Sequence, residues 1–231
     1  LPGMDDETTR NLKAGWLGRL PSPVAQAFLD AGKVQRLPDG AIIYGLGQEQ
    51  FCLFGIASGH VRMWITMNEQ EPRLAHVAGP GFWFGESEVV TGQPRIMEME
   101  ASGQTRLCMV ARRDIDQIAK KHADAWASVA LLAVMNEATA IGAVDDLMIR
   151  DAKKRLAAVL LRLSSHRNAF QGVPPVSAVP VTQTEIADAA TLSRSSAAAI
   201  LAELSRKGII RTDYRTIVIL KPNKLLAVLA D

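Results

Sequence analysis

The spacing of apolar residues changes most clearly along this chain near residue 112. From Val34 to Ala111, short apolar runs alternate with glycines and polar turns such as Ser58-Gly59 and Gly79-Pro80-Gly81. Many short strands separated by turn signals are typical of a β-sandwich or β-roll. From Arg113 onward, apolar residues recur at helical spacing for almost 40 residues. The pattern therefore predicts a β-rich part followed by a long helical part.

The β-rich part is predicted to begin with helices. Residues 5–33 are amphipathic, Pro21 and Pro23 divide them into two short helices, and Gly32 ends the region. The apolar runs that we expect to be strands are residues 41–44, 51–56, 60–66, 73–77 and 105–110. We therefore predict that residues 1–112 form N-terminal helices and a β-roll.

Residues 113–150 are predicted to form a helical connector that carries a dimerisation helix. Two rows of a seven-residue repeat can be traced there: Trp126, Ala133, Ala140 and Leu147 in one, and Val129, Asn136 and Ala143 in the other. Small side chains in these rows let two helix backbones approach, and a single Asn fixes register in a symmetric pair. The alternative is a helix that packs on its own domain, and periodicity alone does not distinguish the two.

Residues 151–231 are predicted to form a winged helix-turn-helix domain. Residues 151–166 form a helix with Leu156, Val159, Leu160 and Leu163 on one face, and residues 167–180 form a loop rich in Gly, Pro and Ser. Thr182 and Glu185 then form a capping box, which opens a short helix to Ala190. Thr191-Leu192 makes a turn, and Ser193 caps a second helix that runs from Arg194 to about Lys207. Gly208 ends it.

Two short helices across a tight turn match the helix-turn-helix, whose second helix enters the major groove by its N-terminus. Arg194 is expected to bind a guanine edge, and the hydroxyl and amide side chains to bind phosphates or bases more weakly. A β-hairpin around Asp213-Tyr214-Arg215 is expected to form the wing. The predicted DNA-binding residues are Thr182, Gln183, Arg194, Ser195, Ser196, Arg211 and Arg215. The alternative is a compact helical hairpin that binds protein.

Charge and composition support a nucleic-acid partner for the C-terminal third. Residues 1–150 hold 14 Lys and Arg against 18 Asp and Glu, whereas residues 151–231 hold 12 against 6. Cys52 and Cys108 are too few for a disulfide framework and are expected to be buried thiols. The apolar run from Ala123 to Met135 is shorter than the roughly 20 residues of a membrane span. We expect a cytoplasmic protein with no membrane partner.

An enzyme is not predicted. Metal-binding cupins share a β-barrel-like pattern but cluster their histidines, whereas His60, His76, His122 and His166 are scattered here. The sequence also offers neither a nucleophile–base pair nor a glycine loop of the kind that cradles phosphates. No catalytic and no metal-ligating residues are therefore predicted.

From about Val34 to Leu220, the sequence resembles the family of the catabolite activator protein and the fumarate–nitrate regulator (CRP/FNR). Three features carry the resemblance in the expected order: the roll segments Gly40–Tyr44, Gly59–Met63 and Phe84-Gly85-Glu86; the long helix before Asp151; and Val181–Ala187 with Leu192–Arg194 and Leu201–Leu204. The resemblance implies an α+β fold, with an N-terminal β-roll of the cyclic-nucleotide-binding kind that acts as a sensor, a long dimerisation helix and a C-terminal winged helix-turn-helix.

The resemblance also implies an effector pocket, from which this sequence departs. Gly85, Glu86 and Arg95 match the family's ribose- and phosphate-binding residues, but Ile96 replaces a hydroxyl residue. Ala140 and Ile141 stand where two hydroxyl residues recognise adenine. Because each lost polar contact costs about 0.5–3 kcal/mol, cyclic AMP is disfavoured. Arg95 and Glu86 either bind a different anionic ligand or form a structural salt bridge.

The sequence does not choose among several other effectors, so the cofactor is unknown. A cyclic-nucleotide-dependent regulator would require the substitutions at Ile96 and Ala140 to be tolerated. A haem-based gas sensor would draw axial ligands from Cys52, His60, Met63 or His76, although no spacing selects a pair. The region before Val34 has no cysteine cluster for an iron–sulfur centre. A regulator without any effector is a further alternative.

The predicted function is that of a homodimeric transcription regulator that binds double-stranded DNA at a pseudo-palindromic site, with RNA polymerase as a further partner if it activates. The recognition helix departs from the family at Ser195 and Ala199, so the family's usual operator is not assumed. Thr191 replaces the usual turn glycine, and a β-branched residue with positive φ would be strained.

Overall fold

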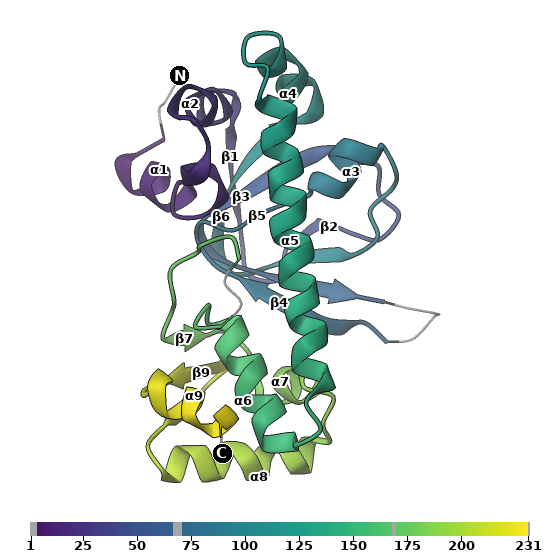
Figure 1. The fold of residues 1–231 in the computed structure, drawn as a ribbon. Coiled ribbons are helices and arrows are strands. Elements are labelled where there is room, and N and C mark those ends of the chain that lie inside the picture. Colours follow the sequence, from purple (N-terminus) through teal and green to yellow (C-terminus); the bar gives the residue numbers. More distant parts are fainter. Residues whose placement is uncertain (1–3, 67–70, 168–169, 231) are drawn as a thin grey trace. The chain divides into compact units, whose positions relative to one another are not determined.

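The computed structural model describes residues 4–66, 71–167 and 170–230, and its chain divides into two compact units. The first unit comprises residues up to Met63, residues 78–137 and residues 170–174. The second comprises residues 64–77, 138–169 and those from Pro175 onward. The long helix α5 (Ala125–Met148) contributes to both units (Figure 1). The boundary between the units therefore falls inside α5, whereas the predicted division had its boundaries after residues 112 and 150.

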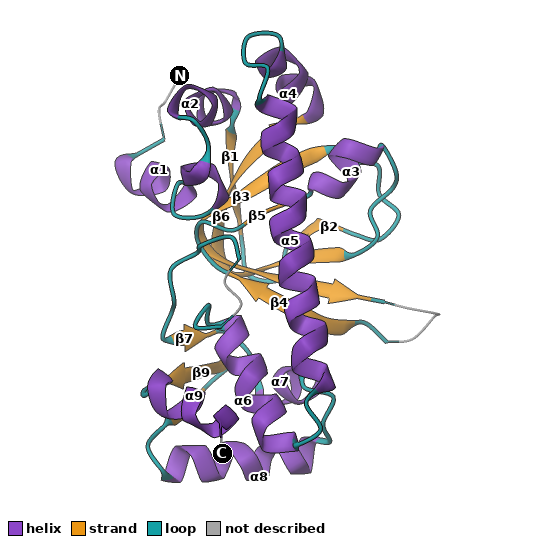
Figure 2. Ribbon diagram, in the orientation of Figure 1, coloured by secondary structure: helices purple, strands orange, loops and turns teal. Residues whose placement is uncertain are grey.

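The sheet of the roll has the strand order β1-β6-β3-β4, with β2 paired to β6 and β5 paired to β3 (Figure 2). Its strands are β1 (Lys33–Leu37), β2 (Ile42–Tyr44), β3 (Cys52–Ile65), β4 (Arg73–Ala78), β5 (Trp83–Phe84) and β6 (Glu98–Ala111). The antiparallel pairing of β1 with β6 joins Lys33 to Met109 and Leu37 to Thr105. The prediction of a β-roll is confirmed.

Two predicted strands, residues 51–56 and 60–66, are one strand in the structure. Ser58-Gly59 does not turn the chain back, because Gly59 takes a φ of +77° within β3. A Cβ on Gly59 would lie 2.6 Å from the Thr105 hydroxyl oxygen, so only glycine lets β3 lie this close to β6. Local turn signals cannot distinguish such an irregularity inside a long strand from a hairpin turn.

Helices cover the roll within the first unit. They are α1 (Asp6–Leu12), the 3-10 turn η1 (Trp16–Arg19), α2 (Ser22–Ala31), α3 (Glu86–Thr91) and α4 (Arg112–Ala119). Trp16 and Trp83 meet edge to face with ring centroids 5.2 Å apart. The Trp16 indole donates to the Ser128 carbonyl oxygen at 2.8 Å, which fixes the first half of α5 against this core.

The predicted helix of almost 40 residues is wrong in its length. The structure has α4 and α5 separated by residues 120–124. That segment is polar except for Ala123, so it supplies no large apolar side chain to hold a helical turn against the core. On α5, Ala125, Val129 and Leu132 are fully buried in the core of the first unit.

The second unit is built around α6 (Ala152–Leu163), α7 (Gln183–Ala189) and α8 (Arg194–Arg206). The strands β7 (Ala178–Val179), β8 (Ile210–Asp213) and β9 (Thr216–Ile219) form a small sheet in the order β7-β9-β8. The apolar face predicted for the first of these helices is confirmed, because its leucines and Val159 are at most 4% exposed. The predicted loop at residues 167–180 contains β7, and its residues 168–169 lie outside the described residues. The structure adds α9 (Pro222–Ala230), whose Leu225 is buried.

By length and composition alone, α5 could cross a membrane. It has 24 residues, and its most apolar stretch reaches a mean hydropathy of 1.6 while only 28% of that stretch is buried. The apolar run seen in the sequence was shorter, because it was ended at Asn136 and Glu137. An apolar helix that is this exposed calls for an explanation of what covers it.

Candidate nucleic-acid interface and effector pocket

The helix-turn-helix is built from local capping interactions. The Glu185 amide donates to the Thr182 hydroxyl at 3.1 Å, and the Glu185 carboxylate accepts from the Thr182 amide at 2.6 Å. This reciprocal capping box begins α7, and Ile186, Ala187 and Ala190 are fully buried. The predicted capping box and inward face are both confirmed.

The turn between α7 and α8 contains a strained residue. Thr191 has a φ of +53°, and its amide donates to the Asp188 carbonyl oxygen at 3.0 Å. The Leu192 amide closes the turn by donating to the Ala187 carbonyl oxygen at 2.9 Å. Thr191 thus takes the positive φ of the glycine that it replaces, and a β-branched residue there stores about 1–3 kcal/mol of strain.

Hydroxyl side chains gather at the N-terminus of α8. The Ser193 hydroxyl accepts from the Ser196 amide at 3.1 Å, as an N-cap, and lies 3.1 Å from the Ser195 hydroxyl and 2.8 Å from the Ser196 hydroxyl. Arg194, Ser195 and Ser196 are all exposed. A helix N-terminus with exposed hydroxyls and a cation suits an anionic partner, because its amide dipoles carry partial positive charge.

The outer face of α8 is lined by small residues, of which the sequence interpretation named only Ala199. Ala197, Leu201 and Leu204 are buried, which leaves Ala198, Ala199, Ala202 and Arg206 exposed on the other side. Alanine methyl groups can contact the thymine methyl group in the major groove. Helical periodicity, counted from the buried residues, could have identified this face.

The hairpin of β8 and β9 forms the predicted wing. Asp213 pairs with Thr216 across a turn in which Tyr214 is 90% exposed and Arg215 has a φ of +52°. The Arg211 guanidinium donates to both carboxylate oxygens of Asp213, at 2.8–3.0 Å. This pairing raises the pKa of Arg211 and lowers that of Asp213. Arg211 was predicted to bind phosphate, but here it is held by a neighbouring carboxylate.

An ion-pair network holds α8 against α6. The ammonium groups of Lys153 and Lys207 lie 2.6 Å and 2.7 Å from the same Glu203 carboxylate oxygen. Hydrogen bonds from these two lysines lower the pKa of Glu203 to about 2. Lys153 is on α6 and the other two residues belong to α8 or its C-cap, so the network fixes the recognition helix from its C-terminal half.

In the roll, Arg95 is a structural residue. Its guanidinium forms an ion pair with Glu88, donates to the carbonyl oxygens of Gln50 and Cys52, and lies 3.9 Å above the ring of Tyr44. The Arg95 side chain has no exposed surface. The predicted pair of Arg95 with Glu86 is therefore wrong in its partner, because the carboxylate two residues further along α3 faces the guanidinium. A structural salt bridge is what the arginine forms.

Glu86 lies beside a different polar group. Burial raises the pKa of Glu86, and a hydrogen bond with the Asn136 side chain opposes that shift. The Asn136 amide donates to the Trp83 carbonyl oxygen at 3.2 Å, and Gln171 donates to the same oxygen at 2.7 Å. Asn136 was predicted to fix register between two helices, but its side chain is engaged inside its own chain. No local sequence signal indicates this network.

The remaining predicted pocket residues are divided between the two units. Gly85, with a φ of +92°, is the N-cap of α3, and Ile96 is 63% exposed. Ala140 is exposed and Ile141 is 60% exposed, and both belong to the second unit, whereas the roll residues belong to the first. Of the alternative haem ligands, Cys52 and Met63 are buried, and the pKa values of His60 and His76 are lowered by burial. Among residues 4–66, 71–167 and 170–230, no three His, Cys, Asp or Glu side chains are grouped to hold a metal ion.

The open face of α5 differs from the predicted rows. Val129 is fully buried, Trp126 packs against the core of the first unit, and Ala133 and Ala143 are partly buried. The large apolar residues that α5 leaves exposed are Leu131, Val134, Ile141, Val144, Leu147 and Met148. With Ala127, Ala138 and Asp145, most of them follow an alternating spacing of four and three residues, which is the repeat of a paired helix. Of the predicted positions, only Ala140 and Leu147 are exposed, and Leu147 is 45% exposed.

Comparison with known proteins gives two family models in the same order along the chain. Residues 34–122 match the model of the cyclic nucleotide-binding domain, and residues 154–228 match the Crp-like helix-turn-helix domain. The chain is 27% identical over 180 residues to the cyclic AMP receptor protein of Thermus thermophilus, covering 78% of this chain and 80% of the relative.

Solved structures give the same result for the fold. A transcriptional regulator of the CRP family from Thermus thermophilus superposes with a TM-score of 0.66 at 25% identity, over 85% of this chain and 97% of that one. FixK2 from Bradyrhizobium japonicum superposes with a TM-score of 0.70 at 18% identity, over 85% and 96% of the two chains. The α+β fold predicted from the sequence is confirmed. Both domain models, the curated relative and the shared architecture place the chain in the CRP/FNR family of helix-turn-helix transcription regulators.

Proposed function

We propose that this regulator binds double-stranded DNA as a homodimer, at a pseudo-palindromic site, through the N-terminus of α8. The observation that carries the proposal is the exposed group of Arg194, Ser195 and Ser196 on a capped helix that follows a helix-turn-helix turn. Thr182, Gln183 and Arg215 are proposed as further phosphate-binding residues, and Arg211 would join them when it is released from Asp213. Two α8 helices one turn of DNA apart would contact half-sites with centres about 34–36 Å apart.

The test is a selection from random duplex DNA with the purified protein, at a stated salt concentration. We expect a two-fold symmetric motif, and we expect Arg194→Ala to relax the choice of base at one position in each half-site. Arg36→Ala, which removes the same charge from an exposed position on β1 in the first unit, is the control, and it should keep the motif. Failure to enrich any motif, with and without cell metabolites, would contradict the proposal.

The dimer is proposed to form through the open face of α5. Regulators of this family are dimeric, and a second copy of the same helix would cover the exposed Leu131, Val134 and Ile141. Ile141→Asp should give a monomer in analytical ultracentrifugation, whereas Val90→Asp, at an exposed apolar residue on α3, should stay dimeric. A lipid partner for α5 is excluded if the purified wild-type protein is a dimer that does not bind vesicles.

The roll is proposed not to bind cyclic AMP. The family model for this domain is named for cyclic nucleotides, but the residues of this chain do not fit a cyclic phosphate. The Arg95 guanidinium is bound by Glu88 and by the carbonyl oxygens of Gly85, Gln50 and Cys52, and the Ile96 side chain offers no donor. We expect no heat of binding in calorimetry with cyclic AMP or cyclic GMP, at a protein concentration at which DNA binding is measured. A small effector of the roll, where there is one, is of another class.

The division of labour proposed for the chain follows the predicted segments. Residues 1–112 act as the sensor, residues 113–150 as the connector and dimer helix, and residues 151–231 as the DNA-binding domain. The family consists of transcription regulators, so we propose no catalytic activity, a cytoplasmic location and, for an activator, contact with RNA polymerase. An absorption spectrum of the purified protein tests the haem alternative directly.

A further inference from the structure

Two arginines on α6 point in the same direction. Arg155 and Arg162 are seven residues apart, which is close to two full helical turns, so both side chains leave the helix on one face. Both belong to the second unit, as do all the groups that they contact. Arginine provides five N–H donors in a planar fork and stays charged, so each can join several acceptors at once.

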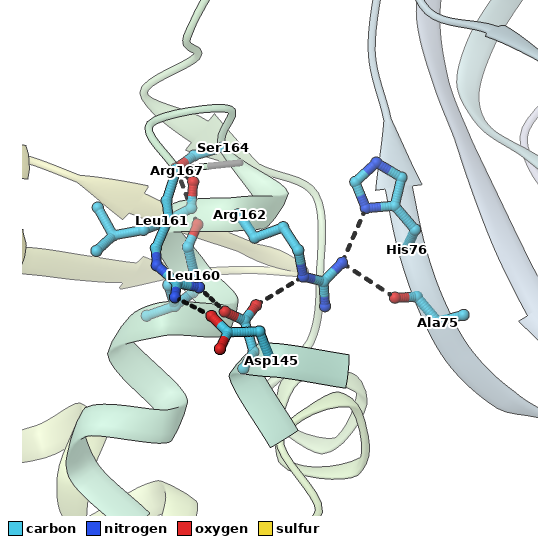
Figure 3. Close-up of polar contacts among 9 residues, drawn as sticks. Ala75, His76, Asp145, Leu160, Leu161, Arg162, Ser164 and Arg167 are labelled. Carbon is cyan, nitrogen blue, oxygen red and sulfur yellow. Dashed lines mark hydrogen bonds and ion pairs between the residues drawn. The ribbon is translucent and has the colours of Figure 1, made fainter. Parts of the chain in front are cut away.

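Arg162 joins three segments of the chain (Figure 3). Its Nε donates to the Asp146 carboxylate at 2.7 Å, and its Nη1 donates to the Ala75 carbonyl oxygen at 3.3 Å. Nη1 also lies 3.1 Å from Nδ1 of His76, which must accept the hydrogen bond because the guanidinium has only donors. Asp146 is near the end of α5, and Ala75 and His76 are on β4. The Arg162 and Asp146 side chains are 3% and 0% exposed.

A second cation binds the buried carboxylate of Asp146. Arg167 also pairs with Asp146, and its other nitrogen lies 2.5 Å from the exposed carboxylate of Asp145. Asp146 is therefore held by two guanidinium groups from the beginning of the proposed DNA-binding domain, one on α6 and one just after it. A buried ion pair of this kind tolerates little displacement, because moving one partner leaves the other charge without solvent or a partner.

Arg155 binds the residues that directly follow α5 in the sequence. Its Nη1 donates to the carbonyl oxygens of Ile149 and Arg150 at 2.6 Å and 3.2 Å. Its Nε donates to the Ala190 carbonyl oxygen, at the C-cap of α7, at 2.7 Å. Arg162 thus binds Asp146, just before the connection between α5 and α6. Arg155 binds that connection itself and also reaches the C-cap of α7 in the helix-turn-helix.

We propose that Arg155 and Arg162 are positioning residues that fix the helix-turn-helix to the last turns of α5 and to β4. Their contacts set the direction in which α8 leaves the dimer helix, and so the separation of the two recognition helices. The inference rests on the proposed function, namely a dimer that binds two half-sites. It implies that β4 and residues 138–148 belong to the same structural unit as the DNA-binding helices.

The test compares two DNA duplexes, one with a single half-site and one with the full palindrome. For Arg162→Met we expect an unchanged affinity for the half-site, and an affinity for the palindrome that falls by about 10- to 100-fold because the two sites no longer fit at once. The preferred spacing between half-sites should also broaden when base pairs are added or removed. Arg162→Lys should recover part of the loss, and Lys121→Met, which removes an exposed cation between α4 and α5 in the first unit, should match the wild type.

The outcomes separate the proposals. A merely structural role would lower both affinities together and leave the preferred spacing sharp, which would overturn the inference. Equal binding of both duplexes by wild type and variant would overturn it too. Wild-type protein that binds neither duplex would count against the proposed function instead. If circular dichroism finds Arg162→Met unfolded, Arg155→Gln, which alters a partly exposed residue, carries the same comparison.

Discussion

Arg95 and Glu88 form an ion pair inside the roll, and their side chains are 0% and 6% exposed. The partner of Arg95 is Glu88, seven residues before it, and not the Glu86 of the family pattern. This pairing makes the Arg95 charge part of the core. The guanidinium also lies over Tyr44, whose pKa is raised by burial. The position that binds a ligand phosphate in the family's pattern is thus a structural support in this chain.

Removing that support should destabilise the first unit. Arg95→Ala leaves the Glu88 carboxylate buried without its partner, and we expect the free energy of unfolding to fall by about 3–5 kcal/mol. Urea denaturation monitored by tryptophan fluorescence measures it. Arg113→Ala is the control, because its pair with Asp114 is 3.9 Å apart and the arginine is 79% exposed. Similar small effects of both substitutions would contradict the structural role.

Thr191→Gly should stabilise the protein. Glycine adopts the positive φ of this turn without strain, and the exposed threonine side chain gives up no buried contact. We expect a gain of about 1 kcal/mol, seen as a higher Tm in calorimetry. Thr191→Ala relieves less of the strain and should give a smaller gain. A lower Tm for the glycine variant would mean that the hydroxyl has an unrecognised partner.

Asp213→Asn should strengthen DNA binding. The substitution releases Arg211 from its bidentate partner and removes a negative charge from the wing, so one more cation faces the phosphates. We expect an affinity about threefold higher and a steeper dependence on salt, by about one unit of slope. Fluorescence anisotropy over a salt series measures both. Asp116→Asn makes the same charge change in α4 of the first unit, and it should leave the slope unaltered.

The stability of the protein should fall between pH 6.5 and pH 4.5 because of His76. Burial, together with the charge of Arg162, lowers the pKa of His76 to about 3. Below pH 6.5 the unfolded chain binds a proton at this position that the folded chain does not, so the stability present above that pH is progressively lost. The imidazole keeps some exposure, so we expect about 1–2 kcal/mol by pH 4.5.

His76→Asn provides the comparison for this pH dependence. Its amide oxygen can still accept from Arg162, but the side chain does not titrate. Since the pKa of His60 is also lowered, only the difference between wild type and variant isolates His76. Parallel stability curves for the two proteins from pH 7 to pH 4.5 would contradict the prediction.

The DNA-binding half of the molecule could be predicted because its signals are local. Thr182 and Glu185 are three residues apart, Ser193 caps the amide of Ser196, and Gly208 ends the helix with a φ of +61°. Such interactions depend on neighbours in the sequence, so the sequence itself identifies them. The alternation of strands and turns likewise determined the roll.

Only the tertiary structure decided which way each helix face points and which partner each charged side chain meets. The periodicity of α5 is compatible with several faces, and only the packing of Val129 against the first unit determines that Val134 and Ile141 face outward. The choice of Glu88 over Glu86, and the meeting of Arg162 with Asp146 and His76, join segments up to 86 residues apart. A charged side chain binds whichever partner the fold brings within about 3 Å, and sequence spacing does not record that distance.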